Sequence, residues 1–157
     1  MRESDECFPL NHYAMSKYMF EEYAKKSKIT IPLQIFRYFN VYGPHEDHKG
    51  NQASPYYQFT KQAKETGIIR VFEGSENFKR DFVHVDTVVN KHIEHIRYMC
   101  QYSSATFNVG SGYARSFMDV AKDIDLLHEA RIEIIPFPEH LRRHYQTYTC
   151  ADLSAAL

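Results

Sequence analysis

A tyrosine and a lysine four positions apart, Tyr13 and Lys17, have the clearest potential for chemistry in this sequence. Asn11 is suited to cap a helix, and the pattern after it predicts a helix through about Lys26. On a helix this spacing places the phenol and the ammonium group on one face. A nearby cation favours the phenolate form, so the pair suits general base catalysis.

The spacing alone does not distinguish a catalytic pair from an ordinary surface pair. About one match to Tyr-x-x-x-Lys is expected by chance in a chain of this composition. Tyr57 and Lys61 form a second match. Both interpretations therefore stay open at this stage, and the elements around the pair must decide between them.

Helix and strand signals alternate along the chain, which predicts an α/β fold with a partly parallel sheet. Strands are expected at 31–39, 68–72, 82–85, 106–109 and 132–135. Helices are expected at 11–26, 55–65, 86–102 and 116–128, with a polar loop at 40–54 and a further helix starting at Ala151. The third helix, capped by Asp86, is expected to bury an apolar stripe formed by Val89, Ile93, Ile96, Met99 and Cys100.

The glycine cluster at Gly110, Ser111 and Gly112 lacks the third glycine and the ribose-binding acidic residue of the dinucleotide fingerprint. We therefore expect the phosphate site of a nicotinamide cofactor to lie outside this chain. The chain opens close to a helix and stops inside an expected one, which is typical of a piece that lacks an amino-terminal βαβ half.

Composition excludes several classes of protein. The formal net charge is −1 in 157 residues, and basic residues are interspersed with acidic ones, which argues against a nucleic-acid partner. No apolar run approaches the roughly 20 residues that span a bilayer, and the polar, acidic start does not fit a signal peptide. We therefore expect no membrane association.

The cysteines and histidines do not predict a metal site. The three cysteines, Cys7, Cys100 and Cys150, are too far apart for a Cys-x-x-Cys zinc site and fit no disulfide framework. Three histidine pairs have helix-compatible spacing but no third ligand, whereas zinc needs three or four: His45 with His48, His92 with His95, and His140 with His144. Together with the composition, this cysteine usage indicates the reducing cytoplasm.

Four segments follow the tyrosine–lysine pair in a fixed order: 37–44, which contains Asn40-Val41-Tyr42-Gly43-Pro44, then 72–75, 79–86 and 107–110. This series resembles the extended short-chain dehydrogenase/reductases that act on nucleotide sugars, the NAD-dependent epimerase/dehydratase family. The resemblance covers nearly the whole chain. It implies the carboxy-terminal part of a Rossmann-like fold with its smaller substrate-binding region.

The same resemblance implies a division of the single fragment 1–157. Segments 1–45 and 81–110 correspond mainly to the remaining Rossmann-like sheet and helices. Segments 46–80 and 111–157 correspond mainly to the substrate-binding region. Relatives commonly form homo-oligomers, and a companion chain that supplies the amino-terminal half is a further expected partner. Strand edges and apolar helix faces left without that half predict poor stability alone.

A closer resemblance is to the branch of this family that acts on ADP-heptoses. Segments 48–50, 72–82 and 134–138, with Tyr145 and Gln146, carry it, and Lys49 is the most discriminating residue. The branch inverts C6 of ADP-D-glycero-D-manno-heptose by transient hydride transfer to NADP, with NAD as the alternative cofactor, and supplies heptose for the lipopolysaccharide core. The alternatives are another nucleotide-sugar epimerase or dehydratase of the family and a non-catalytic remnant.

The resemblance also implies roles for single residues. Tyr13 and Lys49 would be the two acid/base groups, and Lys17, Val41 and Lys49 would contact the cofactor. The implied substrate-binding residues are Asn40, Asn51, Gln58, Phe72, Glu73, Gly74, Ser75, Arg80 and Tyr145. The family more often has Ser and His at the positions of Asn51 and Gln58. Plain alternatives are an Arg80–Asp81 surface ion pair, a solvated Lys49 and a packing role for Tyr145.

Overall fold

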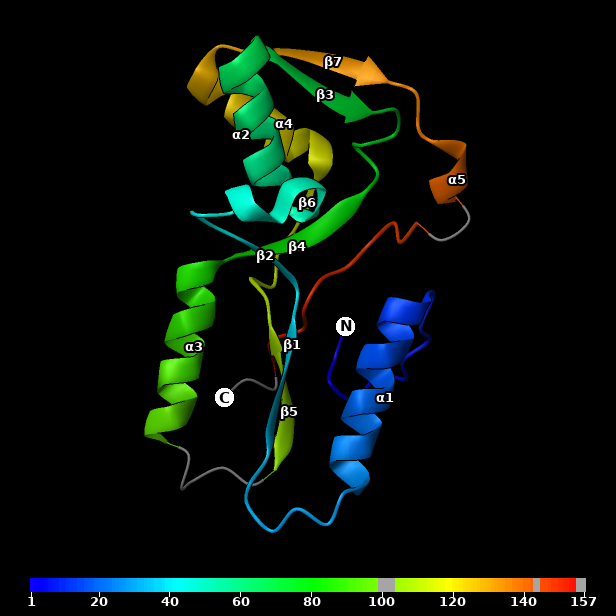
Figure 1. The fold of residues 1–157 in the computed structure, drawn as a ribbon, viewed down its shortest axis with the longest axis vertical. Coiled ribbons are helices and arrows are strands. Elements are labelled where there is room, and N and C mark those ends of the chain that lie inside the picture. The colour runs from blue at the N-terminus through cyan, green and yellow to red at the C-terminus, as the bar shows by residue number, and fades with distance from the viewer. Residues whose placement is uncertain (99–103, 143–144, 155–157) are drawn as a thin grey trace.

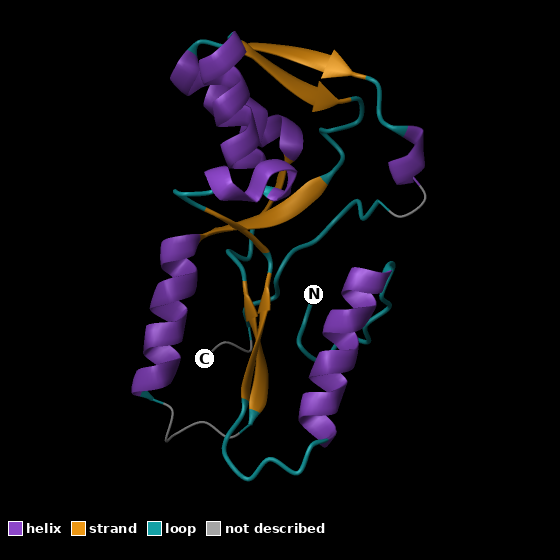
Figure 2. Ribbon diagram, viewed as in Figure 1, coloured by secondary structure: helices purple, strands orange, loops and turns teal. Residues whose placement is uncertain are grey.

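The computed structural model describes residues 1–98, 104–142 and 145–154. Two groups of helices and strands lie at opposite ends of an elongated chain, and short strands cross between them (Figures 1 and 2). The sheets are mostly parallel, which confirms the α/β fold class predicted from the alternating pattern.

The first group is built on a parallel pair of strands, β1 (Gln34–Tyr38) and β5 (Ala105–Val109). Helices α1 (His12–Lys26) and α3 (Val85–Arg97) flank this pair on opposite sides, as Figure 1 shows. Covering both faces with helices is the usual arrangement of parallel sheets, because crossover connections place helices there. Strand β1 is shorter than the expected strand at 31–39.

Helix α1 is fixed at its start and along its length. The side chain of Asn11 accepts a hydrogen bond from the amide of Ala14 at 2.8 Å, which confirms the predicted cap. The guanidinium of Arg37 on β1 binds both carboxylate oxygens of Glu21, at 2.6 and 2.9 Å. This contact holds the pKa of Glu21 below its usual range. Burial opposes the shift, and a hydrogen bond from Lys25 adds to it. The paired, half-buried bridge ties the helix that carries Tyr13 to the sheet.

Helix α3 differs from the expectation in two respects. Its cap is His84, whose Nδ1 accepts from the amide of Asp86, so the predicted cap at Asp86 was wrong. The helix ends at Arg97, and the expected end near 102 lies in residues 99–103, outside the described part. Of the expected stripe, Val89, Ile93 and Ile96 are exposed rather than buried, and Met99 and Cys100 lie outside the described residues.

Two imidazoles take the place of that stripe against the sheet. The rings of His92 and His95 lie 4.4 and 5.0 Å from the ring of Phe36 on β1, and the ring of His95 lies 4.4 Å from that of Phe107 on β5. The contacts of His95 are edge-to-face, an arrangement that aromatic pairs favour, so this face of the helix packs on the sheet in place of the aliphatic stripe.

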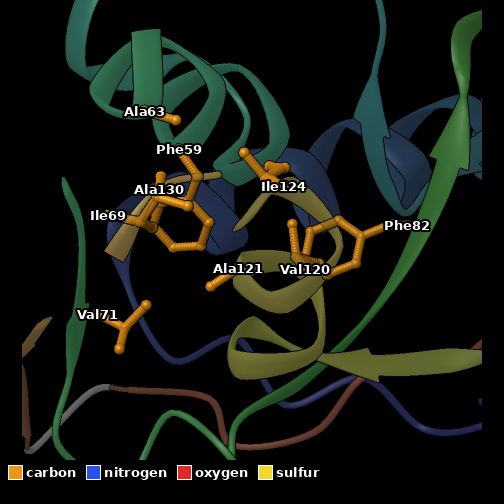
Figure 3. Packing of buried hydrophobic residues seen from close by; sticks show 9 residues of the cluster. All are labelled: Phe59, Ala63, Ile69, Val71, Phe82, Val120, Ala121, Ile124 and Ala130. Atoms are coloured by element: carbon orange, nitrogen blue, oxygen red, sulfur yellow. The ribbon is translucent and has the colours of Figure 1, made fainter. Parts of the chain in front are cut away.

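The second group contains helices α2 (Pro55–Thr66) and α4 (Phe117–His128) and the parallel strands β3 (Ile68–Phe72) and β7 (Arg131–Ile135). Pro55 begins α2, Gly67 ends it with φ 67°, and Ser116 caps α4, as the sequence predicts. The cap of α2 is Ser54, whose side chain accepts from the amide of Tyr57. Figure 3 shows the hydrophobic core, which lies between these elements and is formed by Phe59, Ala63, Ile69, Val71, Phe82, Val120, Ala121, Ile124 and Ala130.

Three short strands cross between the groups: β2 (Asn40–Tyr42), β4 (Lys79–His84) and β6 (Ala114–Ser116). Strand β4 pairs in parallel with β2 and antiparallel with β6. The expected loop at 40–54 therefore contains a strand, and it also contains a 3-10 helix, η1 (Asp47–Gln52). A three-residue strand leaves little signal in sequence because its partner strand, not its own residues, stabilises it.

The carboxy-terminal segment contains α5 (Glu139–Arg142) and then runs back toward the amino terminus. The expected helix from Ala151 is absent from residues 151–154, and 155–157 lie outside the described part. The amide of Ala151 donates to Asp81, and that of Asp152 donates to the carbonyl of Met1. These long-range bonds hold the segment in an extended form.

Candidate active site

Tyr13 and Lys17 meet on an open face of α1. The Nζ atom of Lys17 lies 5.3 Å from the centre of the Tyr13 ring, and the tyrosine is 72% exposed. The second sequence match behaves differently, since Lys61 pairs with Glu65 at 3.9 Å on α2. The structure thus gives the first pair the cation-and-phenol arrangement and an accessible hydroxyl.

Lys49 lies on η1, the cyan coil below α2 in Figure 1. Its Nζ atom lies 3.4 Å from Oε2 of Glu46, so it is a half-exposed lysine with a carboxylate partner rather than a freely solvated one. Lys49 and Tyr13 are carried by separate elements. Gly50, which follows, has φ 52°, a left-handed conformation that glycine adopts without the cost of a Cβ atom.

Glu46 is a residue of this site that the sequence did not reveal. It is only 2% exposed and accepts hydrogen bonds from the amide of Gly43 and from the amide and hydroxyl of Ser54, at 3.1, 2.7 and 2.7 Å. Burial alone would raise the pKa of Glu46, but these bonds outweigh it and lower the pKa below its usual range. An ionised Glu46 therefore both closes the loop and orients Lys49.

The remaining residues near this loop make backbone contacts. The side chain of Asn40 donates to the carbonyl of Asp81 at 3.3 Å, and Val41 pairs with Val83 across β2 and β4. Gln58 on α2 donates to the carbonyl of Gly50 at 2.7 Å, and this bond connects α2 to the turn beside Lys49. Asn51 is exposed on η1.

The turn at Phe72, Glu73, Gly74 and Ser75 opens onto two pockets. The first has a volume of about 170 Å³ and is lined largely by apolar side chains. Its lining also includes four of the predicted site residues: Gln58, Phe72, Ser75 and Tyr145. The second has a volume of about 410 Å³ and is lined by Glu73, Gly74, Phe78, Phe137, Arg142, Tyr145 and Thr147. Phe78 and Tyr145 line both pockets, which therefore adjoin. The structure thus brings the turn at 72–75 and Tyr145 together, as predicted for nucleotide binding, whereas Arg80 lies outside both pockets.

Ser75 has an unusual environment in the first pocket. Its residue is 2% exposed, and its Oγ atom has no hydrogen-bond partner among the described residues. Buried hydroxyls are normally paired, because leaving one unpaired costs roughly 1–3 kcal/mol. A polar ligand atom in the pocket would satisfy this hydroxyl.

Arg80 forms no ion pair with Asp81 and lines neither of these two pockets. It is 9% exposed and donates to the carbonyls of Lys79 and Gln146. Its guanidinium lies 5.3 Å from the ring centre of Tyr145 and 5.7 Å from that of Phe117. Burial lowers the pKa of Arg80 and raises that of Tyr145, so the arginine is a desolvated cation behind a neutral phenol.

The carboxylate of Asp81 lies against the glycine-containing turn at 110–112 and accepts hydrogen bonds from its amides. This fully buried carboxylate accepts from the amides of Ser111 and Gly112, at 2.7 and 3.0 Å, and from the hydroxyl of Ser111. A Cβ atom at Gly110 would lie 2.6 Å from Asp81 Oδ2, so glycine is needed there for packing. The amides of Ser111 and Gly112 are thus taken by Asp81 and are not free for a phosphate, whereas the tyrosine and lysine expected at the nicotinamide end of a cofactor are accessible.

The described residues contain neither a candidate metal site nor a candidate membrane span. No three His, Cys, Asp or Glu side chains come together there in an arrangement that could hold a metal ion. None of the helices in the same residues is long and apolar enough to cross a membrane. Cys7 and Cys150 are free thiols.

A mostly parallel α/β fold with a tyrosine–lysine pair on a flanking helix is typical of the extended short-chain dehydrogenases. The NAD dependent epimerase/dehydratase family matches residues 1–110, and the chain belongs to this family. The resemblance inferred from the motifs is thereby confirmed.

A curated relative narrows the similarity. The ADP-L-glycero-D-manno-heptose-6-epimerase of Brachyspira hyodysenteriae is 44% identical over 151 residues, which cover 93% of this chain and 47% of the relative. The chain therefore spans about half the length of this relative. The match confirms the resemblance to heptose epimerases.

Solved structures agree with this assignment. The ADP-L-glycero-D-manno-heptose-6-epimerase of Helicobacter pylori matches with a TM-score of 0.70 and 30% identity, over 80% of this chain and 40% of that one. A complex of MoeE5 with UDP-glucuronic acid and NAD matches with a TM-score of 0.75 and 22% identity, over 99% of this chain and 51% of that one, and shows the fold alone.

Proposed function

We propose that this chain supplies the substrate-binding and acid/base half of a cytoplasmic epimerase that inverts C6 of ADP-D-glycero-D-manno-heptose. The observation that carries the proposal is the 44% identity to a heptose epimerase over 93% of the chain. The exposed Tyr13 beside Lys17 and the two pockets at the Phe72–Ser75 turn supply a chemical and a binding site consistent with it. The product would serve lipopolysaccharide core synthesis.

The hydrogen on the inverted sugar carbon is not acidic, so acid/base groups alone cannot remove it. The chemistry that NADP, or NAD in its place, supplies when bound is acceptance of a hydride and its return to the opposite face of the carbon. The chain's own residues then have to move the hydroxyl proton and orient the sugar in two directions.

In this proposal Tyr13 takes the hydroxyl proton in one orientation of the sugar and Lys49 acts in the other. The ammonium of Lys17 favours the phenolate of Tyr13 and also contacts the nicotinamide ribose. Val41 lines the nicotinamide side, and Asn40, Asn51 and Gln58 contact the sugar. Glu46 holds Lys49 at the loop.

The ADP portion would occupy the pockets at the Phe72–Ser75 turn. Phe72 provides an aromatic face for adenine, and Gly74, at φ 82°, allows the backbone to approach closely. Glu73 and the unpartnered hydroxyl of Ser75 accept and donate hydrogen bonds to the nucleoside. Tyr145 covers the diphosphate, with the charge of Arg80 behind its ring.

One observation favours a second candidate, a non-catalytic sugar-nucleotide binding chain. The amides of Ser111 and Gly112 are already bonded to Asp81, so neither is free for a cofactor phosphate. A segment that carries a phosphate site, in the same polypeptide or in a companion chain, would be needed for turnover. The two candidates differ in turnover but not in substrate binding.

The test is epimerisation of ADP-D-glycero-D-manno-heptose with NADP by this chain, with and without a separately expressed amino-terminal half of a heptose epimerase. Turnover that needs both chains and is lost in Tyr13→Phe supports the enzyme. Tyr57→Phe is the matched control, because Tyr57 belongs to the other Tyr-x-x-x-Lys match, and it should retain activity. Substrate binding without turnover in either mixture would leave the binding chain as the function.

A further inference from the structure

The side-chain amide of Gln58 extends from helix α2 to the loop that carries Lys49. Its Nε2 atom donates to the carbonyl oxygen of Gly50 at 2.7 Å. A carbonyl oxygen only accepts, so the nitrogen of the amide faces Gly50, and Oε1 is left as an acceptor at the first pocket, which Gln58 lines. The bond therefore fixes the residue that directly follows Lys49 in the chain.

Gly50 is a point at which this loop could take several conformations. It interrupts η1 with φ 52° and ψ −126°, a backbone state that glycine adopts about as readily as its alternatives. A Cβ atom at this position would meet nothing within 4 Å, so packing does not select the conformation. Hydrogen bonds to the Gly50 carbonyl do, from Gln58 and from the amide of Ala53 at 3.2 Å. Of these two bonds, the one from Gln58 comes from outside the loop.

Helix α2, from which this bond comes, is itself held by packing. Its residues Phe59 and Ala63 belong to the hydrophobic core (Figure 3). Ser54, the cap of the same helix, donates to the carboxylate of Glu46, which lies 3.4 Å from Nζ of Lys49. One helix thus holds the loop on both sides of this lysine.

Resting on the proposed function, we propose that Gln58 is a positioning residue for Lys49, which it holds through the carbonyl of Gly50. The bond limits the directions in which the loop presents the ammonium group to the sugar. Such control matters because a misplacement of about 1 Å can cost about a hundredfold in rate. Oε1 of Gln58 can accept from a hydroxyl of the same sugar, so this side chain links recognition of the sugar to the placement of its acid/base group.

The experiment compares two glutamines of α2. Gln58→Met keeps the length of the side chain and removes the donor. Gln62→Met is the matched control, because Oε1 of Gln62 also binds the backbone of another element, the amide of Arg70 on β3, at 2.8 Å. Gln58→His restores an N–H donor. Each variant is measured by amide hydrogen exchange in the free chain and by steady-state turnover with the amino-terminal half.

In Gln58→Met, the amides of Lys49 and Ala53 should exchange about tenfold faster, the scale of one lost hydrogen bond, because both are bonded within this loop. The kcat should fall about tenfold or more and KM should change less, since positioning acts on the chemical step. Gln58→His should recover most of both losses. Gln62→Met should match the unaltered chain in exchange at these two amides and in turnover.

The outcomes separate this inference from the function on which it rests. Unchanged exchange at Lys49 and Ala53 in Gln58→Met would overturn the inference, because the bond would then not hold the loop. Faster exchange with an unchanged kcat would overturn it as well, because the lysine would not need to be held. Both results leave the proposed function standing when the unaltered chain turns over its substrate. If the unaltered chain with the amino-terminal half gives no turnover, the proposed function fails and the inference fails with it.

Discussion

The Nζ atom of Lys49 lies 3.4 Å from Oε2 of Glu46, a carboxylate that the fold buries almost completely. The lysine is held in place by its neighbour, because Glu46 is itself fixed by Gly43 and Ser54. A positioned ammonium group is suited to act as one of two acid/base groups, whereas a mobile one on a polar loop is not.

Replacing Lys49 with Gln should lower epimerisation by about a hundredfold, the usual contribution of one general acid/base group. The assay is steady-state turnover of ADP-D-glycero-D-manno-heptose in the presence of the amino-terminal half. Lys61→Gln, which removes an exposed lysine paired with Glu65, should behave like the unaltered chain. Undiminished turnover in Lys49→Gln would show that another group provides the second acid/base function.

Glu46 should make the fold less stable in acid. Its pKa is lowered in the folded state from an ordinary value of 4.5, so its stabilising contribution is complete above about pH 4.5 and is lost as the pH falls through the lower folded value. Urea midpoints measured between pH 7 and 3 should therefore fall less steeply in Glu46→Gln than in the unaltered chain. Equal slopes in both would contradict an ionised, buried Glu46.

Asp81 should be among the most sensitive positions in the fold. Asp81→Asn places an amide where Ser111, Gly112 and Ala151 donate, and we expect a loss of about 3 kcal/mol in the free energy of unfolding. Asp86→Asn, an exposed carboxylate beside His84, should cost less than about 0.5 kcal/mol. Urea unfolding compares the two, and similar midpoints would argue against a structural role for Asp81.

His95 should give a second pH dependence, at higher pH. Burial lowers the pKa of His95 from its ordinary 6.5, so the neutral form stabilises the fold above about pH 6.5 and this contribution is lost as the pH falls below that value. His95→Phe keeps ring contacts with Phe36 and Phe107 and should flatten the change in urea midpoint between pH 7.5 and 5.5. A variant as pH-sensitive as the unaltered chain would contradict this assignment.

The isolated chain should self-associate. In the described residues, strands β1 and β5 form a two-stranded parallel sheet, and α1 and the residues before it expose Leu10, Met19, Phe20 and Tyr23. Unpaired strand edges and contiguous apolar surface promote association. Sedimentation velocity at increasing concentration should show growing species, reduced in Phe20→Ser. A monomer with one sharp, reversible melt would show that this surface is tolerated in solution.

The sequence predicted well those features that depend on neighbouring residues. Asn11, Ser54, Gly67 and Ser116 set helix ends through local hydrogen bonds and backbone preferences, and the structure places those ends within a residue or two of the expected positions. The tyrosine–lysine pair was predicted for the same reason, since its geometry follows from helical spacing alone.

Features that depend on distant partners were missed. Strand β6 is stabilised by its pairing with β4. Helix α3 places His95 against the sheet because the ring contacts Phe36 and Phe107, which lie on two strands from other parts of the chain. Glu46 orients Lys49 because the loop brings Ser54 back to bond its carboxylate. In the sequence, the local sign of this role is its position three residues before Lys49. Arg142 reached the pocket only through the fold of the carboxy-terminal segment.

The nine core residues in Figure 3 come from positions 59–130, and none of them belongs to α1, β1, α3 or β5. The region around α2 and α4 thus has a hydrophobic core of its own. The region that carries Tyr13 is held together instead by ion pairs and ring contacts, such as those of Arg37 and Phe36. Amide hydrogens in the first region should outlast those in the second by orders of magnitude in exchange. We therefore expect the half of this chain that carries Tyr13 to open locally more often than the half that contains the core.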